Sequence, residues 1–171
     1  MSTHRSRAIA RGLALVLAVA GVPAFASDAP VRSSALDYTD PAARHHPVTC
    51  KEGDREREPG RSLGDMFGEQ WPEQPRPLPG GETRKAHVRA VQFSRDIVRG
   101  APAQRGLVVV AVLVDPAGKP LAARPICATT DGYDNKARRL ALRSFYEPAL
   151  VNGQAVTSVA MLIVPFAGGA R

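Results

Sequence analysis

Histidine, cysteine and acidic side chains are the residues of this chain that could bind a metal ion or carry out acid–base catalysis. The candidate metal ligands are His45, His46, Cys50 and His87. Their spacing contains neither a Cys-x-x-Cys pair nor two histidines one helical turn apart, the arrangements that bring ligands onto one metal ion. The sequence also lacks the Gly-x-Ser-x-Gly motif of a nucleophilic serine. We therefore predict no metal site, no cofactor and no enzymatic activity.

Two further motifs are better explained by local structure than by chemistry. Residues 115–119 contain a Gly-Lys pair, but the glycine-rich run and the following Ser or Thr of a phosphate-binding loop are missing. The Asp-Pro-Ala-Gly order of this segment instead suits a tight turn. Asp131 or Asp134 suits the N-terminus of a helix, where a carboxylate accepts hydrogen bonds from free backbone N–H groups. The first motif therefore indicates a turn at residues 115–119, and the second indicates the start of a helix near Asp131 or Asp134.

The first 26 residues have the pattern of a secretory signal peptide. Arg5, Arg7 and Arg11 precede an apolar run at residues 13–22, and residues 24–26 read Ala-Phe-Ala, which fits the small-x-small cleavage rule. The apolar run is shorter than the ~20 residues that span a bilayer. We expect cleavage and export to the periplasm, with an uncleaved inner-membrane anchor as the alternative.

Export would place both cysteines of the chain in an oxidising compartment. Because the chain has only these two thiols, we predict that Cys50 and Cys127 form a disulfide. Two alternatives stay open: a buried free Cys127, and a bridge between two chains.

The chain is basic, with a formal net charge of +7, and residues 87–171 hold eleven basic and five acidic residues. A basic domain can bind nucleic acid. For an exported protein, acidic lipid headgroups or acidic patches on envelope proteins are more accessible partners. We predict no nucleic-acid partner, and only peripheral membrane contact unless the N-terminal segment stays uncleaved.

Residues 27–85 are predicted to form a polar, proline-rich linker. A mixed charge run occupies residues 51–58, and the closely spaced prolines of residues 72–79 favour an extended chain. Met66, Phe67 and Trp71 form a small apolar cluster within this segment. The cluster either folds back on the following domain or is an exposed docking motif.

Residues 86–171 contain the elements of a folded domain. Residues 106–114, 120–127 and 158–164 are predicted strands, and β-branched residues crowd the first and last of them. The turn at residues 115–119 makes a hairpin of the first two strands. Asn152 and Gly153 form a tight turn before the last strand.

A basic amphipathic helix is predicted between the second and third strands. Helical spacing places on one face Ala137, Leu140, Ala141, Ser144 and Phe145. Arg138, Arg139 and Arg143 lie mostly off that face, as a solvated surface or as a means of steering an acidic partner. Pro148 stops the helix. Residues 83–99 could form a further short helix or an extended edge segment. The predicted fold is α+β, a small antiparallel three-stranded sheet packed on one main helix.

This order of motifs resembles the C-terminal domain of the TonB family, energy transducers of Gram-negative bacteria. The family has a valine-rich strand, a turn with Asp and Gly, a second strand, a small polar loop, a helix, an aromatic exit ending in Pro-Ala, an Asn-Gly turn and a strand ending in Pro-x-Phe. The corresponding residues here are Gly106, 115–118, 129–132, 133–137, 144–149, 152–153 and 164–166. Ser144 stands where the family has a helix tryptophan.

The resemblance implies a periplasmic protein-interaction module that contacts outer-membrane TonB-dependent receptors in energy-coupled transport. In the family the last strand pairs with a short segment of the receptor. An outermost strand has unpaired backbone groups that a partner strand can use. The implied contact residues here are Val159, Ala160, Met161, Leu162, Ile163 and Val164. Alternatively, the strand is occupied by the chain's own linker or by a second copy in a homodimer, or the protein is an accessory envelope protein without energy transduction.

Overall fold

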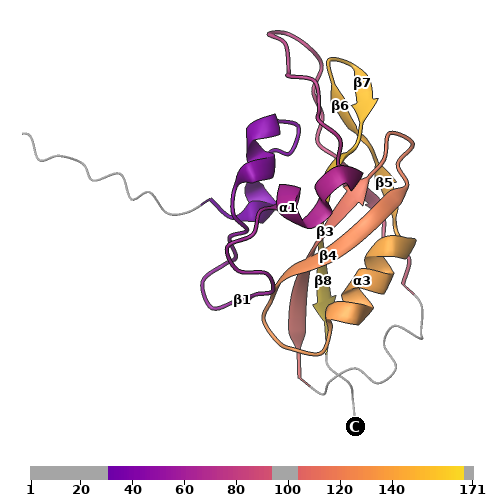
Figure 1. Cartoon of the computed structure of the whole chain (residues 1–171). Coiled ribbons are helices and arrows are strands. Elements are labelled where there is room, and N and C mark those ends of the chain that lie inside the picture. The colour runs from indigo at the N-terminus through magenta and orange to yellow at the C-terminus, as the bar shows by residue number, and fades with distance from the viewer. Residues whose placement is uncertain (1–30, 94–103, 168–171) are drawn as a thin grey trace, which may run out of the picture.

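The structure is a computed structural model that describes residues 31–93 and 104–167. An antiparallel four-stranded sheet with the strand order β1-β4-β3-β8 lies at its centre (Figure 1). The predicted combination of α-helix and antiparallel strands is confirmed. The predicted signal peptide and residues 94–103 of the segment before the sheet lie outside the described residues.

The three long strands of the sheet are the three that the sequence predicted. They are β3 (Gly106–Val114), β4 (Pro120–Ala128) and β8 (Ser158–Phe166). The sheet has a fourth strand, β1 (Arg55–Glu56), which pairs with the last residues of β4. The prediction of a three-stranded sheet is therefore corrected to four strands. Two residues inside a charged run are too few to show the alternation that identifies a strand.

The turn between β3 and β4 forms as its residues predict. Asp115 accepts hydrogen bonds from the backbone N–H groups of Ala117 at 2.9 Å and Lys119 at 2.8 Å. Gly118 has φ of 81°, a conformation that favours glycine. A Cβ atom at this position would also lie only 2.6 Å from the carbonyl oxygen of Tyr146, so there is no room for a side chain.

Two small two-stranded sheets accompany the main sheet. β2 (His87–Ala90) pairs with β5 (Phe145–Glu147), and β6 (Ala149–Val151) pairs with β7 (Gln154–Val156) across the predicted Asn-Gly turn. Residues 87–90 therefore form a strand and not part of a helix over 83–99. Backbone pairing with β5, which is distant in sequence, overrides the helical spacing of the apolar residues.

The main helix, α3 (Asp134–Arg143), buries Ala137, Leu140 and Ala141 completely. It ends before the predicted residue 145, so Phe145 begins β5 and is 56% exposed. Neither predicted acid caps the helix, because Tyr133 occupies the N-cap position and makes no side-chain cap hydrogen bond.

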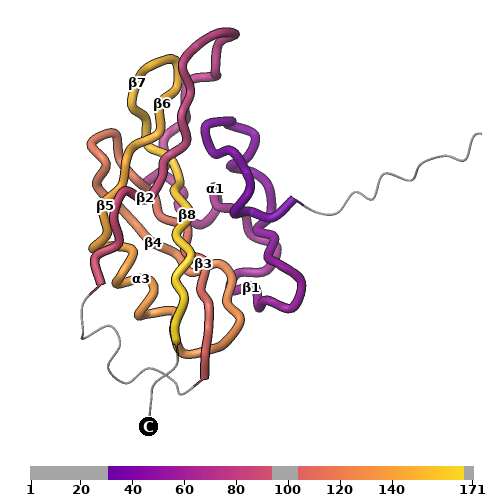
Figure 2. The backbone as a smooth tube through the Cα atoms, turned by 180° about the vertical axis from the view of Figure 1, so that it is seen from behind, coloured from indigo at the N-terminus to yellow at the C-terminus, as the bar shows by residue number. Residues whose placement is uncertain are grey.

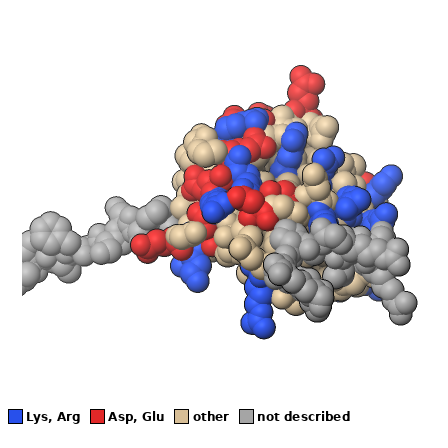
Figure 3. Space-filling view, turned by 90° about the horizontal axis from the view of Figure 1, so that it is seen from below, with Lys and Arg blue, Asp and Glu red and all other residues tan. Residues whose placement is uncertain are grey.

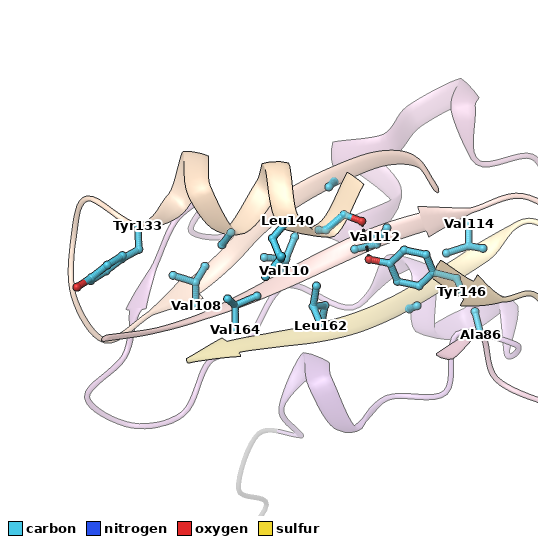
Figure 4. Packing of buried hydrophobic residues seen from close by; sticks show 14 of the residues in the cluster. Ala86, Val108, Val110, Val112, Val114, Tyr133, Leu140, Tyr146, Leu162 and Val164 are labelled. Carbon is cyan, nitrogen blue, oxygen red and sulfur yellow. Dashed lines mark hydrogen bonds between the residues drawn. The ribbon is translucent and has the colours of Figure 1, made fainter. Parts of the chain in front are cut away.

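One face of the sheet forms a core with α3. Valines at alternate positions of β3 meet Leu140 of the helix and Leu162 and Val164 of β8 (Figure 4). The hydroxyl of Tyr146 donates a hydrogen bond of 2.8 Å to the carbonyl oxygen of Ala141 across this core. Since both faces of β3 are buried, its near-continuous apolar sequence is explained.

The other face is covered by residues that the composition assigned to a linker. This N-terminal layer, residues 32–71, comprises η1 (Ser33–Ala35), η2 (Pro41–His45), α1 (Leu63–Phe67) and η3 (Gly68–Gln70), in indigo and purple in Figures 1 and 2. Trp71 is 1% exposed, contacts Tyr38 and Phe67 edge to face, and donates a hydrogen bond of 3.1 Å to the carbonyl of Thr157. The apolar cluster of the segment therefore folds back on the sheet.

Alkaline pH is expected to destabilise this layer through Tyr38. Burial of the Tyr38 phenol raises its pKa from 10.0 to about 12. The unfolded chain loses this proton first, so the contribution to stability is complete below pH 10 and is lost between pH 10 and about 12. The expected loss is at most about 3 kcal/mol. Urea unfolding across this range measures it, and Tyr38→Phe should make the dependence less steep; burial also raises the pKa of Tyr146, which accounts for the dependence that stays. An equally steep dependence in Tyr38→Phe would show that other groups cause it.

Candidate protein-interaction site

The outer edge of β8 is the feature of the described residues that corresponds to the predicted partner-binding strand. β8 is antiparallel to β3 over its whole length, from Ser158 opposite Val114 to Phe166 opposite Gly106. Among the described residues it has no paired strand on its other side. The predicted position of this strand at an edge of the sheet therefore agrees with the structure.

The direction of each backbone group along β8 follows from the pairing of β3. Leu107 exchanges hydrogen bonds with Thr129 on the β4 side, and Asp115 bonds to Lys119 on the same side. Because backbone groups alternate along an antiparallel strand, odd-numbered residues of β3 face β4 and even-numbered ones face β8. The even-numbered residues of β8 then face β3. Val159, Met161 and Ile163 turn their N–H and C=O groups outward.

The first half of β8 is partly covered. β2 lies beside it in Figure 2, and His87 lines a hollow of about 200 Å³ together with Ser158, Val159 and Met161. The second half is more open, and Ile163 is 53% exposed. Pro165 has no N–H group to offer. The accessible edge therefore centres on Ile163.

Most side chains of the predicted binding strand are not available to a partner. Ala160, Leu162 and Val164 point into the core under α3, and Val159 is buried on the opposite face with the N-terminal layer. Met161 is partly buried against that layer. Recognition at this edge would therefore depend on the backbone and on the side chain of Ile163.

The basic residues of α3 do not lie beside the β8 edge. α3 packs mainly over β4 and β3, and β8 forms the edge of the sheet beyond β3. Arg138 is exposed and lines a groove with residues 121–125 of β4. Arg139 is exposed on the same helix, and Arg143 is its last residue. The sequence favoured a solvated surface for these arginines, with at most a role in steering an acidic partner of the last strand, and the fold places them away from the β8 edge.

Cys50 and Cys127 form a disulfide in the structure, with Cα atoms 5.7 Å apart. Cys127 lies near the end of β4 and Cys50 lies in the N-terminal layer. The bond therefore joins this layer to the sheet.

A cluster of ion pairs beside the disulfide was not predicted. The guanidinium of Arg57 contacts Asp131 at 2.7 Å and Asp134 at 3.1 Å, and Arg55 also pairs with Asp131. The two acids assigned to helix capping thus connect the start of α3 to the N-terminal layer. More than seventy residues separate the partners, so no local spacing could have revealed the cluster.

The remaining candidates for chemistry are dispersed. The described ranges contain no group of three His, Cys, Asp or Glu residues that could hold a metal ion. Cys50 is in the disulfide, His45 and His46 are exposed, and the His87 ring lies 3.5 Å from Glu147. No helix in the part of the chain that the structure describes is long and apolar enough to cross a membrane.

No protein-family model, curated protein or solved structure matches this chain.

Proposed function

We propose that this protein is an interaction module of the bacterial cell envelope that binds an extended segment of a partner protein by strand addition at the outer edge of β8. The observation that carries the proposal is the long strand β8, paired on one side only among the described residues. Its outward backbone groups at Met161 and Ile163 can continue the sheet into a partner strand.

The resemblance to the TonB family supplies the class of partner. In that family the last strand of the domain pairs with a short N-terminal segment of outer-membrane receptors. We propose the same role here, in the periplasm and in energy-coupled transport. The open part of the edge near Ile163 would form the contact, and the arginines of α3 would have no part in it.

An accessory role without energy transduction is a second candidate, and the N-terminal layer favours it. A transducer needs an extended spacer between its membrane anchor and its receptor-binding domain. Here the layer packs on the sheet, with Leu63, Phe67 and Trp71 buried and Cys50 bonded to β4. These residues cannot serve as an extended spacer while they are packed in this way.

Ile163→Pro is expected to weaken binding of receptor-segment peptides by at least fivefold. Proline removes the N–H group that points outward at this position while leaving the bonds to β3 in place. Ile163→Ala is the matched control, because it shortens the same side chain and keeps the N–H group. Fluorescence anisotropy with labelled peptides measures the affinities, and circular dichroism checks the fold.

Unchanged affinity in a folded Ile163→Pro variant would rule out strand addition at this edge. Equal weakening in both variants would mean that side-chain contacts, and not backbone pairing, hold the peptide. If the parent protein binds no receptor peptide, the receptor role is wrong.

A further inference from the structure

The opposite edge of the sheet, along β4, is also open over most of its length. β1 pairs only with Cys127 and Ala128, and the N–H of Arg57 bonds to the carbonyl of Ile126 at 2.9 Å. In the described parts of the chain, no strand pairs with the outer side of residues 121–125. The pairing that β1 begins therefore stops partway along β4.

The backbone of Ala123 is the next pairing position after β1. Arg124 lies opposite Ala111 and Ala122 opposite Leu113, and these odd-numbered residues of β3 face β4. Arg124 and Ala122 therefore bond inward, and Ala123 between them turns its N–H and C=O groups outward. Pro125 has no N–H group. A strand added here would bond to Ala123 and continue the line of β1.

This edge forms the floor of a groove with two walls. α3 supplies one wall with Arg138 and Leu142, and Arg57, Glu58 and Gln70 of the N-terminal layer supply the other. The groove has a volume of about 470 Å³. In Figure 1, β4 crosses the front of the sheet between α1 and α3. Leu121 is 47% exposed and Leu142 is 37% exposed, so the groove presents apolar surface beside an open strand edge.

The charge of the groove is positive because its acids are already paired. Asp134 contacts Arg57 at 3.1 Å, and Glu58 pairs with Arg61. Arg124 and Arg138 are exposed, and no described residue forms an ion pair with either. Seen from below, basic side chains gather at the right of Figure 3, the side on which α3 lies in Figure 1.

We propose that this β4 groove binds an extended acidic segment of a partner protein, independently of the β8 edge. The partner strand would pair with the backbone of Ala123. Carboxylates on one face of the added strand would lie beside Arg124, whose side chain shares the sheet face of Ala111 and Ala122. Apolar side chains on the other face would cover Leu121 and Leu142, and Arg138 would attract the acidic segment from the α3 wall. Anionic lipids and nucleic acids share the charge of this ligand but have no backbone amides to pair with a strand edge. The combination of edge, apolar surface and arginines therefore favours a peptide.

The test uses the full chain and a short labelled peptide of alternating Glu and Val residues. Arg124→Glu and Arg138→Glu are each expected to weaken binding at least fivefold, because a repulsive contact replaces an attractive one. Arg89→Glu is the matched control, since Arg89 is an exposed residue of β2, outside the groove. Ala123→Pro should also weaken binding, and Ile163→Pro should leave it unchanged. Fluorescence anisotropy measures each affinity.

Two comparisons separate strand pairing from simple charge attraction. A peptide of the same composition with all Glu residues in one block should bind more weakly, since only the alternating order places carboxylates and apolar side chains on opposite faces of a strand. Equal affinity for both peptides, or an affinity that Arg124→Glu and Arg138→Glu do not change, would overturn the proposal. It would also be overturned if phosphatidylglycerol vesicles bind through these arginines while the peptide does not bind.

Discussion

Leu140→Asp is expected to abolish the cooperative unfolding transition of this protein. Leu140 is fully buried between α3 and the valines of β3. Loss of a large core side chain alone costs about 2–5 kcal/mol. An ionised carboxylate buried without a partner adds a further penalty of several kcal/mol. Together these costs approach the whole stability of a typical domain, about 5–15 kcal/mol.

Leu142→Asp is the matched control, because it makes the same substitution two residues later on the same helix. Its side chain is 37% exposed, so the new carboxylate stays in contact with water and the expected loss is below about 1 kcal/mol. Circular dichroism during urea or thermal unfolding compares the two variants. A Leu140→Asp variant as stable as the parent would mean that α3 buries a different face.

The main sheet and helix could be predicted because their signals are local. The valine-rich segment that forms β3 and the turn at Asp115 and Gly118 need only neighbouring residues to define them. The buried face of α3 follows from the spacing of Ala137, Leu140 and Ala141. Where the local pattern was ambiguous, in residues 87–90, pairing with a distant strand decided the outcome.

The N-terminal layer could not be predicted because its order comes from distant contacts. Its regular elements are one to two turns long, and the capping box of Ser62 and Asp65 encloses a helix of only five residues. Trp71 is placed by Thr157, and Arg57 is placed by Asp131 and Asp134. Composition therefore indicated a linker, although the segment buries one face of the sheet.

The same limit applies to the candidate sites: what neighbouring residues determine could be predicted, and what distant contacts determine could not. The sequence predicted that β8 would be an edge strand, because it is the last strand of a small sheet. It could not predict that β2 would cover the first half of that edge, or that α3 would place Arg138 beside β4. Both outcomes depend on how the elements are arranged around the sheet and not on the residues of any one element.

Removal of the disulfide by a Cys50→Ala, Cys127→Ala double substitution is expected to lower the free energy of unfolding by about 4 kcal/mol. The two cysteines are 77 residues apart in sequence. In the chain-entropy model, a closed loop of this length restricts the unfolded chain by about that amount. Urea unfolding of the parent, the reduced parent and the double variant measures the effect, and the last two should agree.

The same variant tests whether the N-terminal layer is a separate unit of stability. Trp71 is the single tryptophan of the chain and is buried where this layer meets Thr157, so its fluorescence reports on the layer. Circular dichroism reports mainly on the sheet and α3.

We expect coincident transitions in the oxidised protein, because the disulfide links the N-terminal layer to the sheet. Without the bond, the layer is joined to the sheet only by packing and polar contacts, so the fluorescence transition should come at lower urea. Coincident transitions in the double variant would show that packing around Trp71 and the Arg57 ion pairs is sufficient to make one cooperative unit, and an unchanged midpoint would contradict the predicted stabilisation.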